Sequence, residues 1–243
     1  MSQKFAVFDI DGTLFRWQLF HELVAELGNQ DLFPKDVATT VEEKFFEWRA
    51  LKATWADYER EVVKAIIDNI AAIPPNKLSQ CAETVVERSG HKVYNFTSDL
   101  VKKLKNDGYF LLALTGSQQE IAELFAKKHG FDDCIGSLMR RDSNGNFTSE
   151  FERFVIGNKS TILTNYCNEH GFDLNDDSYG VGDSEGDASM LELVTSPIAF
   201  NPDEGLLKLA SSNNWTVVIE RKNLAYVMKV NDETLSVVET KVF

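Results

Sequence analysis

The chain has 243 residues, enough for one large domain or for a core with an insert, and its 43% hydrophobic content can fill a folded core. It carries 38 acidic and 25 basic residues, a formal net charge of −13, so its surface repels phosphates and disfavours nucleic acid or anionic membrane as a partner. The same charge counts against a small anionic substrate unless some of the acids gather around a cation.

The cysteines and the apolar runs exclude several further classes. Cys81, Cys134 and Cys167 are far apart in the sequence and form no C-x-x-C pair, so they suggest neither a disulfide framework nor a zinc site. Acids interrupt the apolar run at the amino end too early for a signal peptide, and no apolar stretch reaches the 18 or so residues of a membrane span. We expect free thiols and a cytoplasmic location.

The amino-terminal third of the chain predicts one strand followed by helices. Lys4–Ile10 is a short apolar run that ends in acids, as a first strand would. Between residues 17 and 90 apolar residues then recur at helical spacing in four segments, the third ending near Pro74. The four stripes are Phe20, Leu23, Val24 and Leu27; Val37, Val41, Phe45 and Trp48; Tyr58, Val62, Ile66 and Ile70; and Leu78, Cys81 and Val85. We expect these stripes to be ordinary core-packing faces.

After Gly90 the pattern alternates between helix and strand. The helices are expected over Thr97–Asn106, Gln118–His129, Ser160–His170, Ala188–Val194 and Glu204–Ser211. The strands are expected over Tyr109–Leu114, Ser178–Val181, Pro197–Phe200 and Trp215–Glu220, with a hairpin of Ser137–Arg141 and Asn146–Phe151. Tyr226–Val230 and Leu235–Val242 form a possible second hairpin across Asn231-Asp232-Glu233.

This alternation favours the α/β class with a doubly wound parallel sheet. The helical stretch 17–90 interrupts the alternation directly after the first strand. We therefore predict a Rossmann-like core made of residues 1–16 and 91–243, with residues 17–90 inserted as a helical cap over the carboxyl edge of the sheet.

Two acidic loops follow predicted strands. Asp9-Ile10-Asp11-Gly12-Thr13 comes directly after the first strand, and Gly182-Asp183-Ser184-Glu185-Gly186-Asp187 comes after the strand at Ser178. Ligands bind outside the carboxyl ends of the strands in such a sheet, where close carboxylates repel one another unless a cation relieves them. A hard ion with oxygen ligands, most simply Mg²⁺, would do so. Asp187 could instead cap the following helix.

Two further segments suggest phosphate binding. Thr115-Gly116-Ser117 ends a buried strand; Ser117 and Glu120 fit a helix capping box, and the Thr115 hydroxyl with nearby amides could hold a phosphoryl oxygen. Lys159 is expected at a helix start, where the helix dipole disfavours a cation. It is therefore either a surface lysine or a side chain that faces an anion or the acid cluster.

The order of these four segments resembles the four motifs of the haloacid dehalogenase (HAD) superfamily. The resemblance covers residues 1–15 and about 91–220, and the helical insert is similar to the C1 cap of the phosphoserine-phosphatase-like subfamily IB. Pro197–Pro202, a following helix and Trp215 are similar to that subfamily as well.

The resemblance implies a phosphatase mechanism with a phosphoaspartyl intermediate. Asp9 would attack phosphorus, and Asp11 would protonate the leaving alcohol and then take a proton from water. Mg²⁺ would be held by the side chains of Asp9 and Asp183 and by the Asp11 carbonyl. The remaining implied contacts are Thr115, Gly116 and Lys159 to phosphoryl oxygens, and Asp187 to Lys159 or to metal-bound water.

The chain departs from phosphoserine phosphatases in the insert. Their glutamate for the substrate amine corresponds to Gln18 here, which disfavours an amino-acid phosphate because a neutral amide cannot offset an ammonium. Arg49 and Arg60 are candidates for binding a substrate carboxylate, and Arg16 and Trp17 could touch the leaving group with Gln18. The four histidines, His21, His91, His129 and His170, are scattered, and we expect them at the surface or at helix ends.

We therefore expect a Mg²⁺-dependent phosphomonoesterase that acts on a small phosphorylated metabolite. The alternatives are a phosphoserine phosphatase or phosphotransferase of the same family, and a non-catalytic phosphate-binding protein. Dehalogenation is disfavoured, because dehalogenases of the superfamily lack an aspartate at the position of Asp11. The substrate and the oligomeric state are not set by the sequence.

Overall fold

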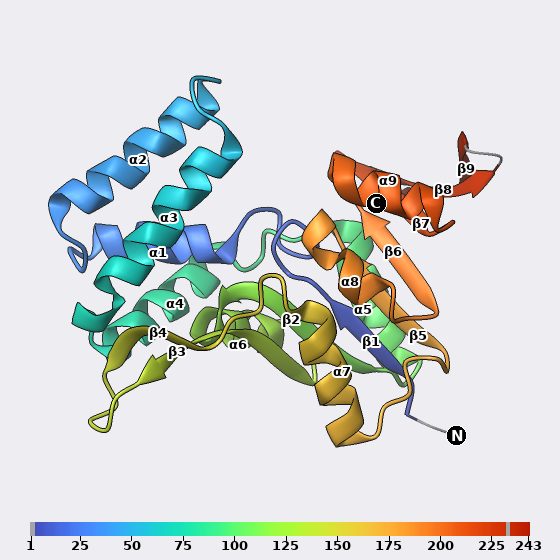
Figure 1. Cartoon of the computed structure of the whole chain (residues 1–243). Helices are drawn as coiled ribbons and strands as arrows, with labels where there is room; N and C mark the ends of the chain where they lie inside the picture. Colours follow the sequence, from blue (N-terminus) through green and yellow to red (C-terminus); the bar gives the residue numbers. More distant parts are fainter. Residues whose placement is uncertain (1–2, 232–233) are drawn as a thin grey trace.

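The computed structural model describes residues 3–231 and 234–243, and these residues build a nine-stranded sheet in the order β4-β3-β2-β1-β5-β6-β7-β8-β9 (Figure 1). The strands are β1 (Phe5–Phe8), β2 (Phe110–Gln118), β3 (Asp133–Arg141), β4 (Phe147–Arg153), β5 (Ser178–Gly182), β6 (Ser196–Phe200), β7 (Thr216–Arg221), β8 (Leu224–Asn231) and β9 (Thr234–Val242). The helices are α1 (Leu19–Asn29), α2 (Lys35–Arg49), α3 (Trp55–Asn69), α4 (Pro75–Ser89), α5 (Asn95–Asn106), α6 (Gln119–Lys128), α7 (Lys159–His170), α8 (Ala188–Leu191) and α9 (Glu204–Ser212).

The centre of the sheet is parallel, which confirms the predicted fold class. Strands β3, β2, β1, β5, β6 and β7 pair in parallel, whereas β4, β8 and β9 are added antiparallel at the two edges. The β3–β4 pair is the predicted first hairpin. The β8–β9 pair is the possible second hairpin, although residues 232 and 233 of its turn lie outside the described residues.

Helices cover both faces of the sheet because the apolar side chains of its central strand alternate. Phe5 and Val7 pack into one core with α7, α8 and α9, and Ala6 and Phe8 pack into the other core with α5 and α6. All four side chains are fully buried. A strand that is buried on both faces explains the continuous apolar run in the sequence.

Helices α1 to α4 follow β1, as predicted, and they lie together at one end of the sheet in Figure 1. Helix α1 packs Leu19, Leu23 and Leu27 into the same core as Phe8. Helix α2 has no buried residue, and Figure 1 shows it with α3 extending away from the sheet. That residues 17–90 form a separate cap domain remains a prediction.

Two local predictions are wrong. Strand β2 continues to Gln118 instead of ending at Leu114, and α6 has Gln118 as its N-cap, so Ser117 and Glu120 form no capping box. Helix α8 ends at Leu191 rather than Val194, after a short 3₁₀ turn over Glu185–Asp187. Within the described ranges no helix is long and apolar enough to cross a membrane.

Candidate active site

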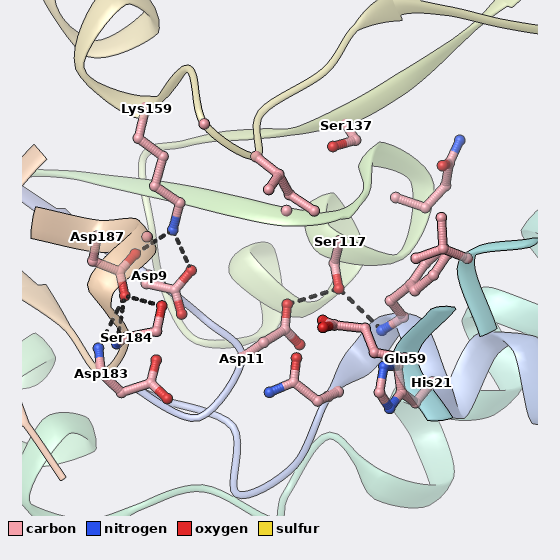
Figure 2. Close-up of a pocket in the computed structure, with 18 of the residues that line it drawn as sticks. Asp9, Asp11, His21, Glu59, Ser117, Ser137, Lys159, Asp183, Ser184 and Asp187 are labelled. Atoms are coloured by element: carbon pink, nitrogen blue, oxygen red, sulfur yellow. Dashed lines mark hydrogen bonds and ion pairs between the residues drawn. The ribbon is translucent and has the colours of Figure 1, made fainter. Parts of the chain in front are cut away.

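The two acidic loops meet because their strands are neighbours. Strand β1 pairs in parallel with β5, with Phe8 opposite Val181. Asp9 and Asp11 follow β1, Asp183 and Asp187 follow β5, and all four line one cavity (Figure 2). The sheet topology therefore brings together acids that are more than 170 positions apart in the sequence.

Gly12 is required by the shape of the first loop. Its φ is +86°, a conformation that L side chains rarely adopt, and a Cβ there would lie 2.1 Å from Asp183 Oδ2. The next residue, Thr13, donates from its hydroxyl to Asp183 Oδ1 at 3.1 Å. The first loop thus packs directly against the carboxylate of the second.

Lys159 joins the cluster from the start of α7 and is buried, so it is not a surface lysine. Its Nζ donates to Asp9 Oδ1 at 2.7 Å and to Asp187 Oδ1 at 2.5 Å. Burial alone would lower the pKa of Lys159, but the charges of Asp187 and Asp9 outweigh it and raise the pKa, so the side chain is an ammonium. The charges that it faces explain a cation at a helix N-terminus.

Asp187 is held as a support for the lysine and for the second loop. Its Oδ1 accepts from Lys159, and its Oδ2 accepts from the backbone N–H groups of Asp183 and Ser184 at 3.0 Å each. The Asp187 side chain does not cap α8. Both of its oxygens are therefore engaged by the protein.

Asp9, Asp183 and Asp187 each offer a carboxylate oxygen, and these oxygens lie within 4.8 Å of one another. Burial raises the pKa of Asp9 to about 7 against the opposing charge of Lys159, and burial together with Asp9 raises the pKa of Asp183 well above its usual range. Mg²⁺ prefers oxygen ligands about 2.1 Å away. The hard, crowded oxygens of Asp9 and Asp183 fit such an ion, which would relieve the repulsion, whereas the Asp187 oxygens are already engaged by Lys159 and by backbone N–H groups.

Asp11 is held by three donors. Its Oδ1 accepts from the Leu19 backbone N–H at 2.5 Å, and its Oδ2 accepts from the Thr115 and Ser117 hydroxyls at 2.7 Å each. Burial raises its pKa, which suits a proton donor. The Thr115 hydroxyl donates to Asp11. To contact a phosphoryl oxygen, as predicted, this hydroxyl would have to give up its hydrogen bond to Asp11.

Ser117 is a functional candidate that the sequence analysis missed. Besides donating to Asp11, its hydroxyl accepts from the Phe20 backbone N–H at 3.0 Å and so connects β2 to α1. The third position of Thr115-Gly116-Ser117 was the available signal, but the capping interpretation assigned the hydroxyl to the helix. Gly116 lines the cavity, as its predicted role requires.

The cavity has a volume of about 500 Å³ and extends from the acids to the helices that follow β1. Gln18 lines it, whereas Arg16, Trp17, Arg49 and Arg60 do not. Further lining residues that the sequence analysis missed are Phe20, His21, Trp55, Glu59, Val63, Gln118, Ser137, Phe151, Phe154 and Ile156. Figure 2 shows Lys159, Asp9, Asp183 and Asp187 at one end, with Glu59 and His21 at the other.

Of the two predicted locations, surface or helix end, His21 fits only the second, because it lies buried in the first turn of α1. His21 is only 4% exposed. Its ring stacks on the Trp55 ring with 5.1 Å between the ring centroids, and it meets the Tyr58 ring edge-on with 5.0 Å between the centroids. Burial lowers its pKa to about 4, so the imidazole is neutral near pH 7. Its Nδ1 has no hydrogen-bond partner in the described structure.

Comparison with known families gives one match over most of the chain. The model of the haloacid dehalogenase-like hydrolase family matches residues 6–192. This range includes both acidic loops, Thr115 and Lys159. The four aspartates of the acidic loops and Lys159 line one cavity, whereas Thr115 does not line it and contacts Asp11 instead.

Among curated proteins, a histidinol-phosphatase of Neisseria meningitidis is 24% identical over 89% of this chain and 98% of its own length. A phosphoserine phosphatase of Archaeoglobus fulgidus is 24% identical over 94% of this chain and 60% of its own. An inhibition of morphological differentiation protein of Streptomyces azureus is 28% identical over 56% of this chain and 50% of its own. The chain therefore spans only about half the length of some of the curated relatives that it matches.

Solved structures support the fold. A Bordetella pertussis protein of unknown function has a TM-score of 0.74 and 21% identity, covering 90% of this chain and 99% of its own. A phosphoserine phosphatase in a phospho-aspartyl intermediate analogue form has a TM-score of 0.58 and 20% identity, covering 91% of this chain and 95% of its own. At these identities the likeness concerns the architecture.

Proposed function

The chain belongs to the haloacid dehalogenase-like hydrolase family, and we propose that it is a phosphatase that hydrolyses a small phosphorylated metabolite with Mg²⁺ through a phosphoaspartyl intermediate. The observation that carries the proposal is the buried Lys159 between Asp9 and Asp187, beside Asp183. In the proposed roles, these residues would supply a nucleophile, a phosphate-binding cation and metal ligands at one end of one cavity. The phosphatase names of two relatives support the same class.

Asp9 is the proposed nucleophile because it faces the cavity directly after β1 and Lys159 occupies only its Oδ1. The free oxygen would attack phosphorus in line with the leaving alcohol, forming the P–O bond to Asp9 as the bond to the alcohol breaks. Lys159 and the Gly116 amide would bind phosphoryl oxygens, and their positive charge would stabilise the charge that develops there.

Asp11 is the proposed general acid and base. Its raised pKa would let it carry the proton that the leaving alkoxide needs, and it would then accept a proton from the water that attacks the phosphoaspartate. The hydroxyls of Thr115 and Ser117 and the Leu19 N–H hold this carboxyl in place. Since Leu19 begins α1, the position of Asp11 depends on the segment after β1.

Asp9, Asp183 and the Asp11 carbonyl would hold Mg²⁺, with Asp187 fixing Lys159. When bound, the ion neutralises charge on the phosphoryl group and on the carboxylates. Asp9 must be a carboxylate both to attack phosphorus and to bind the ion, so at neutral pH a bound ion and Lys159 would together keep it charged against the effect of its burial.

The test is hydrolysis of p-nitrophenyl phosphate with Mg²⁺ by the wild type and by Asp9→Asn. We expect the wild type to release p-nitrophenol and phosphate, and Asp9→Asn to lose at least about 10³-fold in kcat. Asp99→Asn, which changes an exposed aspartate of α5, is the matched control and should keep wild-type activity. Full activity of Asp9→Asn would exclude this nucleophile, and an inactive wild type would favour a phosphate-binding role.

A further inference from the structure

The end of the cavity farthest from Lys159 is built mainly from helices α1 and α3 and the segment around β4. We call it the leaving-group pocket and define it by His21, Trp55, Glu59, Gln118 and Phe151, with Ile156 on its side toward Gly116. An ester whose phosphate lies at Asp9 would extend its alcohol into this space. The residues that line this pocket therefore indicate which class of alcohol the substrate ester contains.

The charge of the pocket is negative. Glu59 lines it, and Figure 2 shows this carboxylate directed toward Ser117 and Asp11. Glu59 is an exposed residue of α3 whose carboxylate faces the cavity; partial burial of this carboxyl raises its pKa, and the described residues give it no ion pair and no hydrogen bond. Among the described residues, Lys159 is the one lysine or arginine that lines the cavity. Its charge is already neutralised by Asp9 and Asp187.

The predicted partners for a substrate carboxylate lie elsewhere. Arg60 pairs with Asp57 and remains exposed, and the Arg49 guanidinium lies over the Trp48 ring, 5.7 Å from its centroid. A carboxylate on the leaving group would therefore enter a pocket that holds Glu59 and Asp11 and offers it no cation. An ammonium would instead meet the unpaired Glu59.

Two buried nitrogens beside the pocket have no hydrogen-bond partner among the described residues. Gln118 is 1% exposed and its Nε2 has no hydrogen-bond partner, and the same holds for Nδ1 of His21 at 4% exposure. Leaving a buried amide donor unpaired is costly unless a bound molecule satisfies it. Both residues line the cavity, but neither nitrogen is itself accessible from it, so a molecule in the cavity would pair with one only after that side chain turns toward it.

The walls also present apolar surface. Trp55, Phe151 and Ile156 line the pocket from three segments, and Trp55 is in turn stacked on the neutral His21. Apolar walls with a few placed polar groups are typical of pockets for small organic molecules. A leaving group that fills this space therefore has an apolar or aromatic part besides its polar groups.

Building on the proposed function, we infer that the substrate is the phosphate ester of an amino alcohol with an apolar or aromatic body and no carboxylate. Glu59 binds the ammonium, and Trp55 with Phe151 and Ile156 covers the body. On this inference a carboxylate from α3 compensates for Gln18 in binding an ammonium, whereas an amino-acid phosphate, which also carries a carboxylate, stays disfavoured as the sequence predicts.

The test compares kcat/KM, with Mg²⁺, for two substrate pairs that each differ by one group. Phenylalaninol phosphate and 3-phenylpropyl phosphate differ by the amine, and O-phosphoethanolamine and O-phosphoserine differ by the carboxylate. We expect the amine to raise kcat/KM about tenfold or more and the carboxylate to lower it by a similar factor. We also expect phenylalaninol phosphate to exceed O-phosphoethanolamine.

The variants are Glu59→Gln and, as a matched control, Glu61→Gln, which removes a charge on the same helix outside this pocket. The amine preference should fall to about one in Glu59→Gln and stay at the wild-type value in Glu61→Gln. Because each ratio is taken within one protein, partial unfolding of a variant cancels.

The outcomes separate the inference from the proposed function. Hydrolysis of p-nitrophenyl phosphate without any amine preference, or with O-phosphoserine preferred, overturns the inference and leaves the proposed phosphatase intact. An amine preference that survives in Glu59→Gln also overturns it. If no phosphate ester, including p-nitrophenyl phosphate, is hydrolysed, the proposed function and the inference fall together.

Discussion

Replacing Gly12 with alanine tests how the first loop holds the metal-binding carboxylate. The substitution forces a side chain into φ +86°, which costs about 1–2 kcal/mol. It also places a Cβ 2.1 Å from Asp183 Oδ2, closer than any real contact, so this carboxylate must move. The backbone cost and the displaced carboxylate are two separate effects.

Gly108→Ala isolates the first effect. Gly108 has φ +84°, and a Cβ there meets no atom within 4 Å, so this variant bears the same backbone cost with no displaced carboxylate. We expect both variants to lose about 1–2 kcal/mol of unfolding free energy in urea without metal. Gly12→Ala alone should lose the stabilisation by Mg²⁺ and about 100-fold or more in kcat/KM, equivalent to about 2.7 kcal/mol.

The assay is urea unfolding with and without Mg²⁺, together with hydrolysis of p-nitrophenyl phosphate. Gly108→Ala should keep the Mg²⁺ effect and its activity within about twofold of the wild type. If Gly12→Ala responds to Mg²⁺ and turns over substrate as Gly108→Ala does, then the contact between Gly12 and Asp183 does not position a metal ligand, and the reasoning is refuted.

Two predictions concern pH. The pKa of Asp9 is raised to about 7, so between pH 3.8 and pH 7 the folded protein binds more protons than the unfolded chain. The free energy of unfolding without metal should therefore fall as pH rises through this range. Mg²⁺ should therefore raise Tm more at pH 8 than at pH 5, and an equal rise at both would contradict proton–metal competition. His21 makes stability change with pH in the opposite direction. Its pKa is lowered to about 4 in the folded protein, so below pH 6.5 the unfolded chain binds more protons and stability falls as pH falls. His21→Phe should thus remove up to about 3 kcal/mol of the stability loss between pH 7 and pH 4, measured by urea unfolding, and an unchanged pH slope would show that His21 does not stay neutral.

The residues at the carboxyl end of β1 and β5 could be predicted because their positions follow from the sheet. A buried parallel strand has a recognisable apolar run, and topology brings the acids after two such strands to one edge. Lys159 was recognisable by its conflict with the helix dipole, which its two carboxylate partners resolve. For these residues local pattern and tertiary position agree.

The residues of the leaving-group pocket could not be predicted, because their roles arise from packing between helices. The periodicity of α3 shows Tyr58 and Val62 as core residues but does not show that Glu59 turns toward the cavity. His21 is buried by aromatic rings from other segments, among them Trp55 and Tyr58, which no local pattern reveals. Ser117 was assigned to a cap because the irregular extension of β2 to Gln118 has no sequence signal.

The central claim, a phosphoaspartyl intermediate on Asp9, is tested most directly with Asp11→Asn and p-nitrophenyl phosphate. p-Nitrophenolate leaves without a general acid, so the first step should proceed, whereas hydrolysis of the intermediate needs the base that the variant lacks. The account predicts a burst of about one p-nitrophenol per site and, after acid quench, a phosphoryl group on the peptide containing Asp9. Linear release from the first turnover with no phosphorylated peptide, or phosphorylation of another residue, would contradict it.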